Sequence, residues 1–466
     1  MDLLVRGGTV VTASESKRAD VAVSGGRIEA ILAPADGERA AEGAAEVIDA
    51  AGLLVLPGVI DVHTHTRVAS DAEPDRFFQD SVAAAYGGTT TFLAFNNPGT
   101  GSSPAAGRSL MVGLREWRAA TDGDSAIDCA VSLALSGQMD DPLAELPAIV
   151  DAGVPTAKAF MVYDFRLEDE RLFAALRMLG RAGGMLEIHC EDPVLIGAAV
   201  ADALHGGNTA PRYHATSRPP IAEEIATARA MAFAQYAEAP VYVVHLSSIG
   251  ALAAVRAAKA RDVRAFAETC PHYLTLTEDR YADPDNGEVA KAIVSPPLRS
   301  AADRDALWAG LAEGSLDLVA TDHVPDRTTI EKRVDGVPFD QISNGAPGIE
   351  TLLALVYSEG VARGRIGPER MVDLLATAPA RLFGLGSKGA IEPSKDADLV
   401  LFDPAARRTI RAADLHHTSD YTPYEGISVT GAVHSVFVRG RPVIRDGAFH
   451  GQRGFGRFVE RLLDWG

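Results

Sequence analysis

The chain has 466 residues, of which 47% are apolar and 23% are charged, which is a composition typical of a globular protein. Its formal charge of −19 argues against nucleic acid or an anionic membrane as a partner, because both require a basic surface. Three scattered cysteines do not suggest a disulfide framework, and neither a signal peptide nor an apolar run of about 20 residues is apparent. We therefore expect a cytoplasmic protein.

Both ends of the chain are predicted to form short strands. Near the start, alternating apolar residues interrupted by glycine pairs predict strands over 3–6, 9–12, 20–23 and 27–31, and similar patterns recur at 398–403, 435–438 and 443–444. Neither end is long enough to bury a core alone, so we predict that residues 1–52 and 385–450 form one small β-sandwich.

The region between these ends alternates short apolar runs with helical patterns. The predicted strands are 59–62, 89–95, 127–135, 154–160, 185–188, 241–244, 263–269 and 316–320. The predicted helices include 75–86, 104–120, 169–182, 222–237, 251–260 and 302–312. Eight such units predict an α/β fold, a (β/α)8 TIM-like barrel over residues 53–384. Residues 451–466 remain as a C-terminal tail.

Polar side chains follow several of the predicted strands, where barrel enzymes place their active sites. They are His63, His65, Lys158, His189, His245 and Asp322. Imidazole and carboxylate bind Zn²⁺ and similar ions, so the pattern predicts a metal site. A lysine ammonium would repel metals, but a carbamate formed on Lys158 with CO2 could bridge two ions, which together would acidify a bridging water to hydroxide. Six other histidines are expected at the surface: His205, His214, His416, His417, His434 and His450.

Several motifs lie at or near these positions. They are PGVIDVHTH (57–65), KAFMVY (158–163), IHCE (188–191), VHLSS (244–248), ETCPHYL (268–274), SPPLR (295–299), TDH (321–323) and DYTPYEG (420–426). Together they resemble the cyclic amidohydrolases, a family that includes hydantoinase, dihydropyrimidinase, allantoinase and dihydroorotase. The resemblance covers nearly the whole chain.

The resemblance implies a role for each site residue. The first ion would be held by His63, His65 and Asp322, the second by His189 and His245, and both by carbamylated Lys158. Zn²⁺ is the expected metal. Asp322 would also carry the proton from the attacking hydroxide to the leaving ring nitrogen.

Three further residues resemble the hydantoinase and dihydropyrimidinase branch. Tyr163 would donate a hydrogen bond to the substrate carbonyl, while the backbone of Ser295 and Asn344 would hold the cyclic imide. The predicted reaction opens the ring of a hydantoin or dihydropyrimidine to give an N-carbamoyl amino acid. The resemblance also implies a homo-oligomer, a dimer or tetramer, with the C-terminal tail as a candidate subunit contact.

Two features depart from that branch. Arg67 occupies the position of an arginine that holds the substrate carboxylate in dihydroorotase-like enzymes, and Asn96-Asn97-Pro98 resembles allantoinase and dihydroorotase. Arg67 could instead be a rim residue paired with Asp71 or Glu73. Allantoinase and dihydroorotase-like activities therefore stay open as alternatives. A non-catalytic scaffold on this fold is a more remote alternative, because all six ligand positions are filled.

Overall fold

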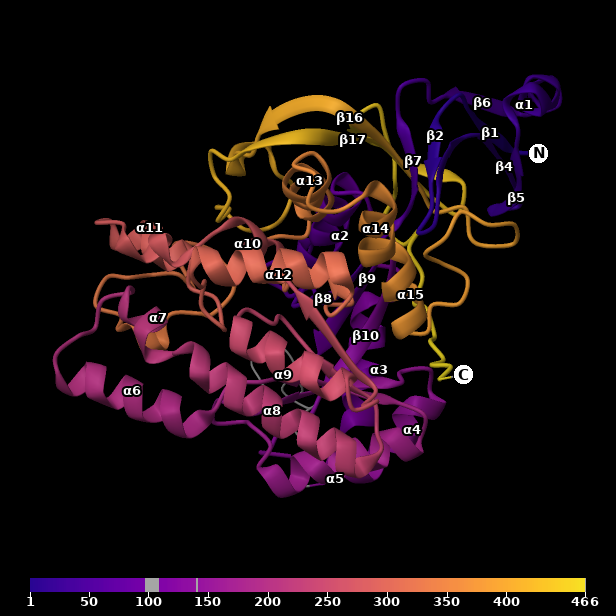
Figure 1. Ribbon diagram of the computed structural model, residues 1–466. Helices are drawn as coiled ribbons and strands as arrows, with labels where there is room; N and C mark the ends of the chain where they lie inside the picture. The colour runs from indigo at the N-terminus through magenta and orange to yellow at the C-terminus, as the bar shows by residue number, and fades with distance from the viewer. Residues whose placement is uncertain (97–108, 140, 466) are drawn as a thin grey trace.

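The computed structural model describes residues 1–96, 109–139 and 141–465, and Figure 1 shows a barrel beside a smaller β-rich part. The barrel strands are β8 (Val59–Thr64), β9 (Thr89–Asn96), β10 (Asp128–Ala134), β11 (Thr156–Phe160), β12 (Met185–His189), β13 (Val241–Val243), β14 (Ala265–Thr269) and β15 (Leu318–Val319). They are hydrogen-bonded in sequence order and run parallel. A parallel bridge between Thr64 and His323 joins the first strand to the end of the eighth, so the predicted (β/α)8 barrel is confirmed.

Helices connect and cover the strands of this barrel (Figure 1). The longer helices are α2 (Arg76–Tyr86), α3 (Leu110–Thr121), α5 (Asp169–Arg181), α6 (Pro193–His205), α8 (Pro220–Ala237), α9 (Ile249–Lys259) and α12 (Ala301–Glu313). The shorter ones are α4 (Leu146–Asp151), α7 (Tyr213–Ser217), α10 (Pro271–Thr275), α11 (Asn286–Lys291), α13 (Leu352–Val356), α14 (Pro368–Val372) and α15 (Ala378–Leu382).

Local sequence explains where several of these helices begin. The hydroxyl of Ser248 accepts a hydrogen bond from the amide of Ala251 and caps α9, directly after the sixth strand. Ser300 and Asp303 form a reciprocal capping box at the start of α12. Such caps satisfy amide groups that have no partner within the helix. They fix the point at which the chain leaves the mouth of the barrel.

The two chain ends form the β-rich part, where the indigo N-terminal strands lie beside the yellow C-terminal ones (Figure 1). One sheet has the order β5-β4-β1-β6 and the other β19-β18-β17-β16-β7-β2-β3. Their bounds are β1 (Leu3–Arg6), β2 (Thr9–Val11), β3 (Ser16–Arg18), β4 (Asp20–Ser24), β5 (Arg27–Leu32), β6 (Glu46–Asp49), β7 (Leu54–Pro57), β16 (Leu399–Thr409), β17 (Ser428–Val438), β18 (Arg441–Arg445) and β19 (Ala448–Phe449). A short helix, α1 (Pro34–Ala41), joins β5 to β6.

A shared apolar core holds these sheets together. It combines Val5, Val21 and Ile28 from the start of the chain with Leu399 and Phe437 from its end. The sandwich built from both ends is therefore present. Because β7 pairs with β2 and β16, we propose that the barrel domain begins at residue 58 rather than 53, and we keep the other predicted boundaries.

The C-terminal tail lies along its own barrel. Val459 donates a backbone hydrogen bond to Cys129 (2.8 Å), and Leu463 packs in a cluster that contains Tyr242 and Phe383. Arg461 is 3% exposed and donates to the carbonyl of Val131 at 2.6 Å. These contacts hold the tail within the subunit, and its role between subunits stays a prediction.

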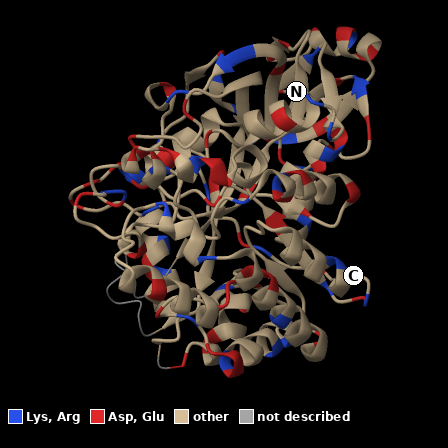
Figure 2. Cartoon of the chain, turned by 60° about the vertical axis from the view of Figure 1, so that its left-hand side comes forward, with Lys and Arg blue, Asp and Glu red and all other residues tan. Residues whose placement is uncertain are grey.

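The surface carries charges of both signs. Figure 2 shows acidic and basic residues interspersed over the visible elements rather than gathered into one basic face. Among the helices that the structure describes, none combines the length and the apolar character needed to cross a bilayer.

Candidate metal centre

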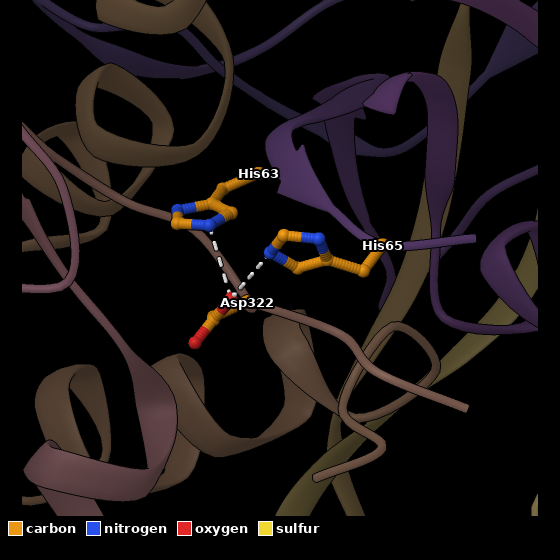
Figure 3. A group of neighbouring side chains, drawn as sticks. All are labelled: His63, His65 and Asp322. Carbon is orange, nitrogen blue, oxygen red and sulfur yellow. Dashed lines mark ion pairs between the residues drawn. The ribbon is translucent and has the colours of Figure 1, made fainter. Parts of the chain in front are cut away.

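Three predicted ligands meet at the mouth of the barrel. His63 and His65 come from the end of β8, and Asp322 follows β15 (Figure 3). The Nε2 atoms of the two histidines lie 3.0 Å and 3.2 Å from the same carboxylate oxygen, Oδ1 of Asp322. One potential ligand atom from each residue lies within 4.8 Å of the others. This geometry suits a divalent cation held by two imidazoles and a carboxylate.

The other three predicted ligands lie beside this group. The ring centres of His189 and His245 are 4.4 Å apart, and that of His245 is 5.4 Å from His63. Lys158 is fully buried, its Nζ lies 4.5 Å from the ring centre of Phe95, and it has no hydrogen-bond partner among the described residues. A buried ammonium without a partner is costly, so this position favours a modified or neutral lysine.

Three residues of this site have a strained backbone. Tyr163, His245 and Asp322 have φ values of 76°, 39° and 50°, in the left-handed region that residues other than glycine rarely adopt. Such conformations cost about 1–3 kcal/mol each and persist where the surroundings enforce them, most often at functional sites. The strain therefore supports a functional role for these residues.

Burial determines the charge of most of the imidazoles. It lowers the pKa of His65, His189 and His245, so these rings are neutral, which is the form that binds metal. For His63, burial and the charge on Lys158 also act to lower the pKa, but the carboxylates of Glu268 and Asp322 outweigh them and raise it to about 9. A cation would therefore compete with a proton at His63.

Two carboxylates that the sequence analysis did not assign fix the orientation of the histidines. Glu268 bonds Nδ1 of His63 and also accepts from the hydroxyl of Tyr242 at 2.7 Å. Glu191 bonds Nε2 of His189 at 2.7 Å. Partners of this kind hold metal-binding histidines in one tautomer and orientation. Glu268 lies near the end of the seventh predicted strand, to which the sequence analysis assigned no site residue. A carboxylate at that strand end was the signal that could have identified it.

The cluster opens into a cavity of about 870 Å³. Tyr163, Ser295 and Asn344, the predicted substrate-binding residues, all line it. Burial raises the pKa of the Tyr163 hydroxyl, while the charge on Arg218 and hydrogen bonding to Ser295 and Asn344 oppose that increase. The three residues thus converge on one wall, and at ordinary pH the tyrosine is a hydrogen-bond donor.

Arg67 also lines this cavity, but two carboxylates occupy its guanidinium. It donates to Asp326 at 2.7 Å and to Glu331 at 2.6 Å. Asp71 and Glu73, the partners considered from the sequence, are not the ones that the structure shows. Asn97 and Pro98 lie outside the described residues.

His214 and His417 are 2% and 8% exposed, so the expectation that they lie at the surface was wrong.

Comparison with known proteins places the chain among the amidohydrolases. The model of the amidohydrolase family matches residues 54–443. A D-hydantoinase from Streptomyces coelicolor is 38% identical over 98% of this chain and 97% of its own, and a D-phenylhydantoinase from Escherichia coli is 37% identical over 99% and 98%. Among solved structures, a dihydropyrimidinase from Brevibacillus agri superimposes with a TM-score of 0.93, at 39% identity over 99% of both chains. An L-hydantoinase from Arthrobacter aurescens is 27% identical, with a TM-score of 0.87 and coverage of 99% and 100%. The chain belongs to the amidohydrolase family.

Proposed function

We propose that the protein hydrolyses the cyclic amide bond of hydantoins and dihydropyrimidines and releases N-carbamoyl amino acids. The main observation in support is that Tyr163, Ser295 and Asn344 line the same cavity as the His, Asp and Lys cluster. A planar imide presents alternating donors and acceptors, which suit one phenol and nearby backbone groups. The names of the relatives, which include hydantoinases and a dihydropyrimidinase, support the same substrate class.

The donor set fits two divalent cations, for which Zn²⁺ is our proposal. His63, His65 and Asp322 would hold one ion, and His189 and His245 would hold the other. A carbamate on Lys158 would bridge them, and it would explain why a buried lysine lies among four imidazoles without a hydrogen-bond partner in the described structure. When bound, such a pair of ions acidifies a water molecule and polarises the ring carbonyl.

The residues of the chain perform the remaining steps in this proposal. Asp322 lies at the centre of the cluster, so its carboxylate can accept a proton from the attacking water and return it to the leaving ring nitrogen. The Tyr163 hydroxyl donates a hydrogen bond to the carbonyl oxygen as negative charge develops on it. Ser295 and Asn344 hold the imide so that its carbonyl carbon faces the attacking water.

A substrate panel tests the proposal. Dihydrouracil, hydantoin, both enantiomers of 5-substituted hydantoins, allantoin and dihydroorotate are offered to the zinc-loaded protein, and ring opening is followed by loss of ultraviolet absorbance. We expect turnover of hydantoins or dihydrouracil, and Tyr163→Phe should lower kcat about 10²-fold or more. Turnover of allantoin or dihydroorotate alone would move the protein to another branch, and a metal-free inactive protein would indicate a scaffold.

We further propose that the enzyme acts on small molecules in the cytoplasm as a dimer or tetramer. The exposed Leu462, which lies between the buried Arg461 and Leu463 in the tail, is available for a subunit contact. Gel filtration with light scattering of the wild type and of Leu462→Asp measures the oligomeric state. A smaller species in the variant would support the contact.

A further inference from the structure

The buried guanidinium of Arg218 lies between two parts of the proposed active site. Arg218 follows α7, immediately before Pro219 and α8, and is 7% exposed. The sequence analysis assigned it no role. On one side it faces Glu191, the partner of His189, and on the other it faces Tyr163.

The first contact connects Arg218 to a proposed metal ligand. Its Nη1 donates to Oε2 of Glu191, the same oxygen that bonds Nε2 of His189 at 2.7 Å. Glu191 is fully buried, so its negative charge requires a nearby cation. Because one oxygen serves both neighbours, the position of the guanidinium determines the position of the carboxylate and through it the His189 ring.

The second contact connects Arg218 to the proposed oxyanion donor. The guanidinium carbon lies 5.3 Å from the centre of the Tyr163 ring, within the range of a cation–π interaction. That ring also makes an edge contact with His189, with 5.4 Å between the ring centres. Tyr163 has a φ of 76°, so its backbone conformation needs support from its surroundings.

Arg218 is itself held in place. Its carbonyl accepts a hydrogen bond from Nη1 of Arg299 at 2.6 Å, and Nε of Arg299 donates to Ser247 at 3.1 Å, two residues after His245. Arg299 is 6% exposed and also lies 3.5 Å from Glu223. These contacts fix the backbone from which the Arg218 side chain extends, and its planar guanidinium can then impose geometry on the groups that it contacts.

We infer that Arg218 is a positioning residue that holds His189, through Glu191, and Tyr163 in a single arrangement. This inference rests on the proposed function, because it assigns His189 to the metal and Tyr163 to the substrate. It adds one link: binding of the second ion and stabilisation of the oxyanion depend on the same buried cation.

The main test removes the guanidinium in the full-length protein. We expect Arg218→Gln to bind the more weakly held of two zinc ions about 10–100-fold less tightly, and to lose a similar factor in kcat, with little change in KM. Zinc affinity is measured with a competing chelator and needs no substrate. Glu191→Gln should weaken zinc similarly, and the double variant should be no worse than the more impaired single variant, because both changes break one chain of contacts.

Arg229→Gln is the matched control. Arg229 lies 3.5 Å from Asp192, the neighbour of Glu191, so the variant removes a similar charge from the same region. We expect it to keep wild-type zinc affinity and kcat. If Arg229→Gln lowered zinc affinity and kcat as much as Arg218→Gln does, the loss of any nearby positive charge would explain both results. The inference about Arg218 would then be wrong.

Arg218→Lys separates the contact with Glu191 from the contact with Tyr163. It also provides the test if Arg218→Gln does not fold. Lysine keeps the charge but presents one nitrogen instead of a planar fork, so zinc should be retained while kcat falls. Wild-type kcat in Arg218→Lys, or wild-type zinc affinity and kcat in a folded Arg218→Gln, would overturn the inference. A wild type that opens no cyclic amide would refute the proposed function instead, while the zinc measurements would still report on Arg218 and His189.

Discussion

Replacing Arg67 with alanine separates the two candidate substrate classes. The guanidinium bonds Asp326 at 2.7 Å and Glu331 at 2.6 Å, and Asp326 is fully buried. Breaking a buried ion pair costs about 3–5 kcal/mol. Because the Arg67 side chain is 25% exposed and Lys332 stays 3.8 Å from Asp326, we expect the free energy of unfolding to fall by only about 1–3 kcal/mol.

The effect on catalysis should be smaller. A hydantoin ring has no carboxylate for Arg67 to bind, so kcat/KM should fall by less than about tenfold, or ~1.4 kcal/mol. Urea unfolding measures the first quantity, and ring opening of a 5-substituted hydantoin measures the second. Arg76→Ala is the control, because Arg76 lines the same cavity but pairs with the partly exposed Glu73. An Arg67→Ala protein of unchanged stability whose KM rises a hundredfold, beside a nearly intact Tyr163→Phe, would show that Arg67 binds a substrate carboxylate.

Three other substitutions test the site and its surroundings. Lys158→Ala should lack activity and bind less metal, and short-chain carboxylic acids should partly restore both; full activity in the variant would exclude the carbamate. Asp322→Asn should lower kcat by about 10²–10⁴-fold with a much smaller change in KM, and a loss within tenfold would remove its role as the base. His214 has a pKa lowered to about 3, mainly by burial, whereas in the unfolded chain it titrates near 6.5. The unfolded state therefore binds an extra proton between these values, so stability falls with decreasing pH, by about 2 kcal/mol at pH 5. His214→Gln should remove that part of the acid sensitivity in unfolding measurements at pH 7.5 and 5, and an unchanged pH dependence would contradict the assignment.

The barrel could be predicted from the sequence because its strands are buried on both faces and appear as continuous apolar runs. The proposed ligands could be located because a side chain at a strand end points to the barrel mouth, and this holds for His63, His189 and Asp322 alike. Strands such as β3 and β6 were missed. All three residues of β3 are polar and exposed, and β6 alternates exposed and partly buried residues, so neither carries a strong apolar signal.

Contacts between residues distant in the sequence could not be predicted from local patterns. Arg67 was expected beside acidic residues in its own loop, yet it pairs with carboxylates 259 and 264 positions away. His214 lies on a short helix whose pattern does not show that its ring reaches the carbonyl of Val294 at 2.9 Å. Arg218 is likewise unremarkable in sequence, and its position between Glu191 and Tyr163 depends on how α7 and α8 pack over the barrel.

The split sandwich has a consequence for biosynthesis. Arg27 donates a hydrogen bond to the carbonyl of Ser394, 367 residues later, and β7 pairs with β16 across a similar interval. At about 5–20 residues per second, a ribosome needs roughly 20–70 s to make that interval, and during this time β2, β3 and β7 lack the C-terminal strands of their sheet. The exposed Lys17 and Arg18 on the edge strand β3 disfavour pairing with other chains before the C-terminal strands are made. A polypeptide terminated after residue 390 would contain every proposed metal ligand and still leave β7 without its antiparallel neighbour, so truncated products should be prone to aggregation and degradation.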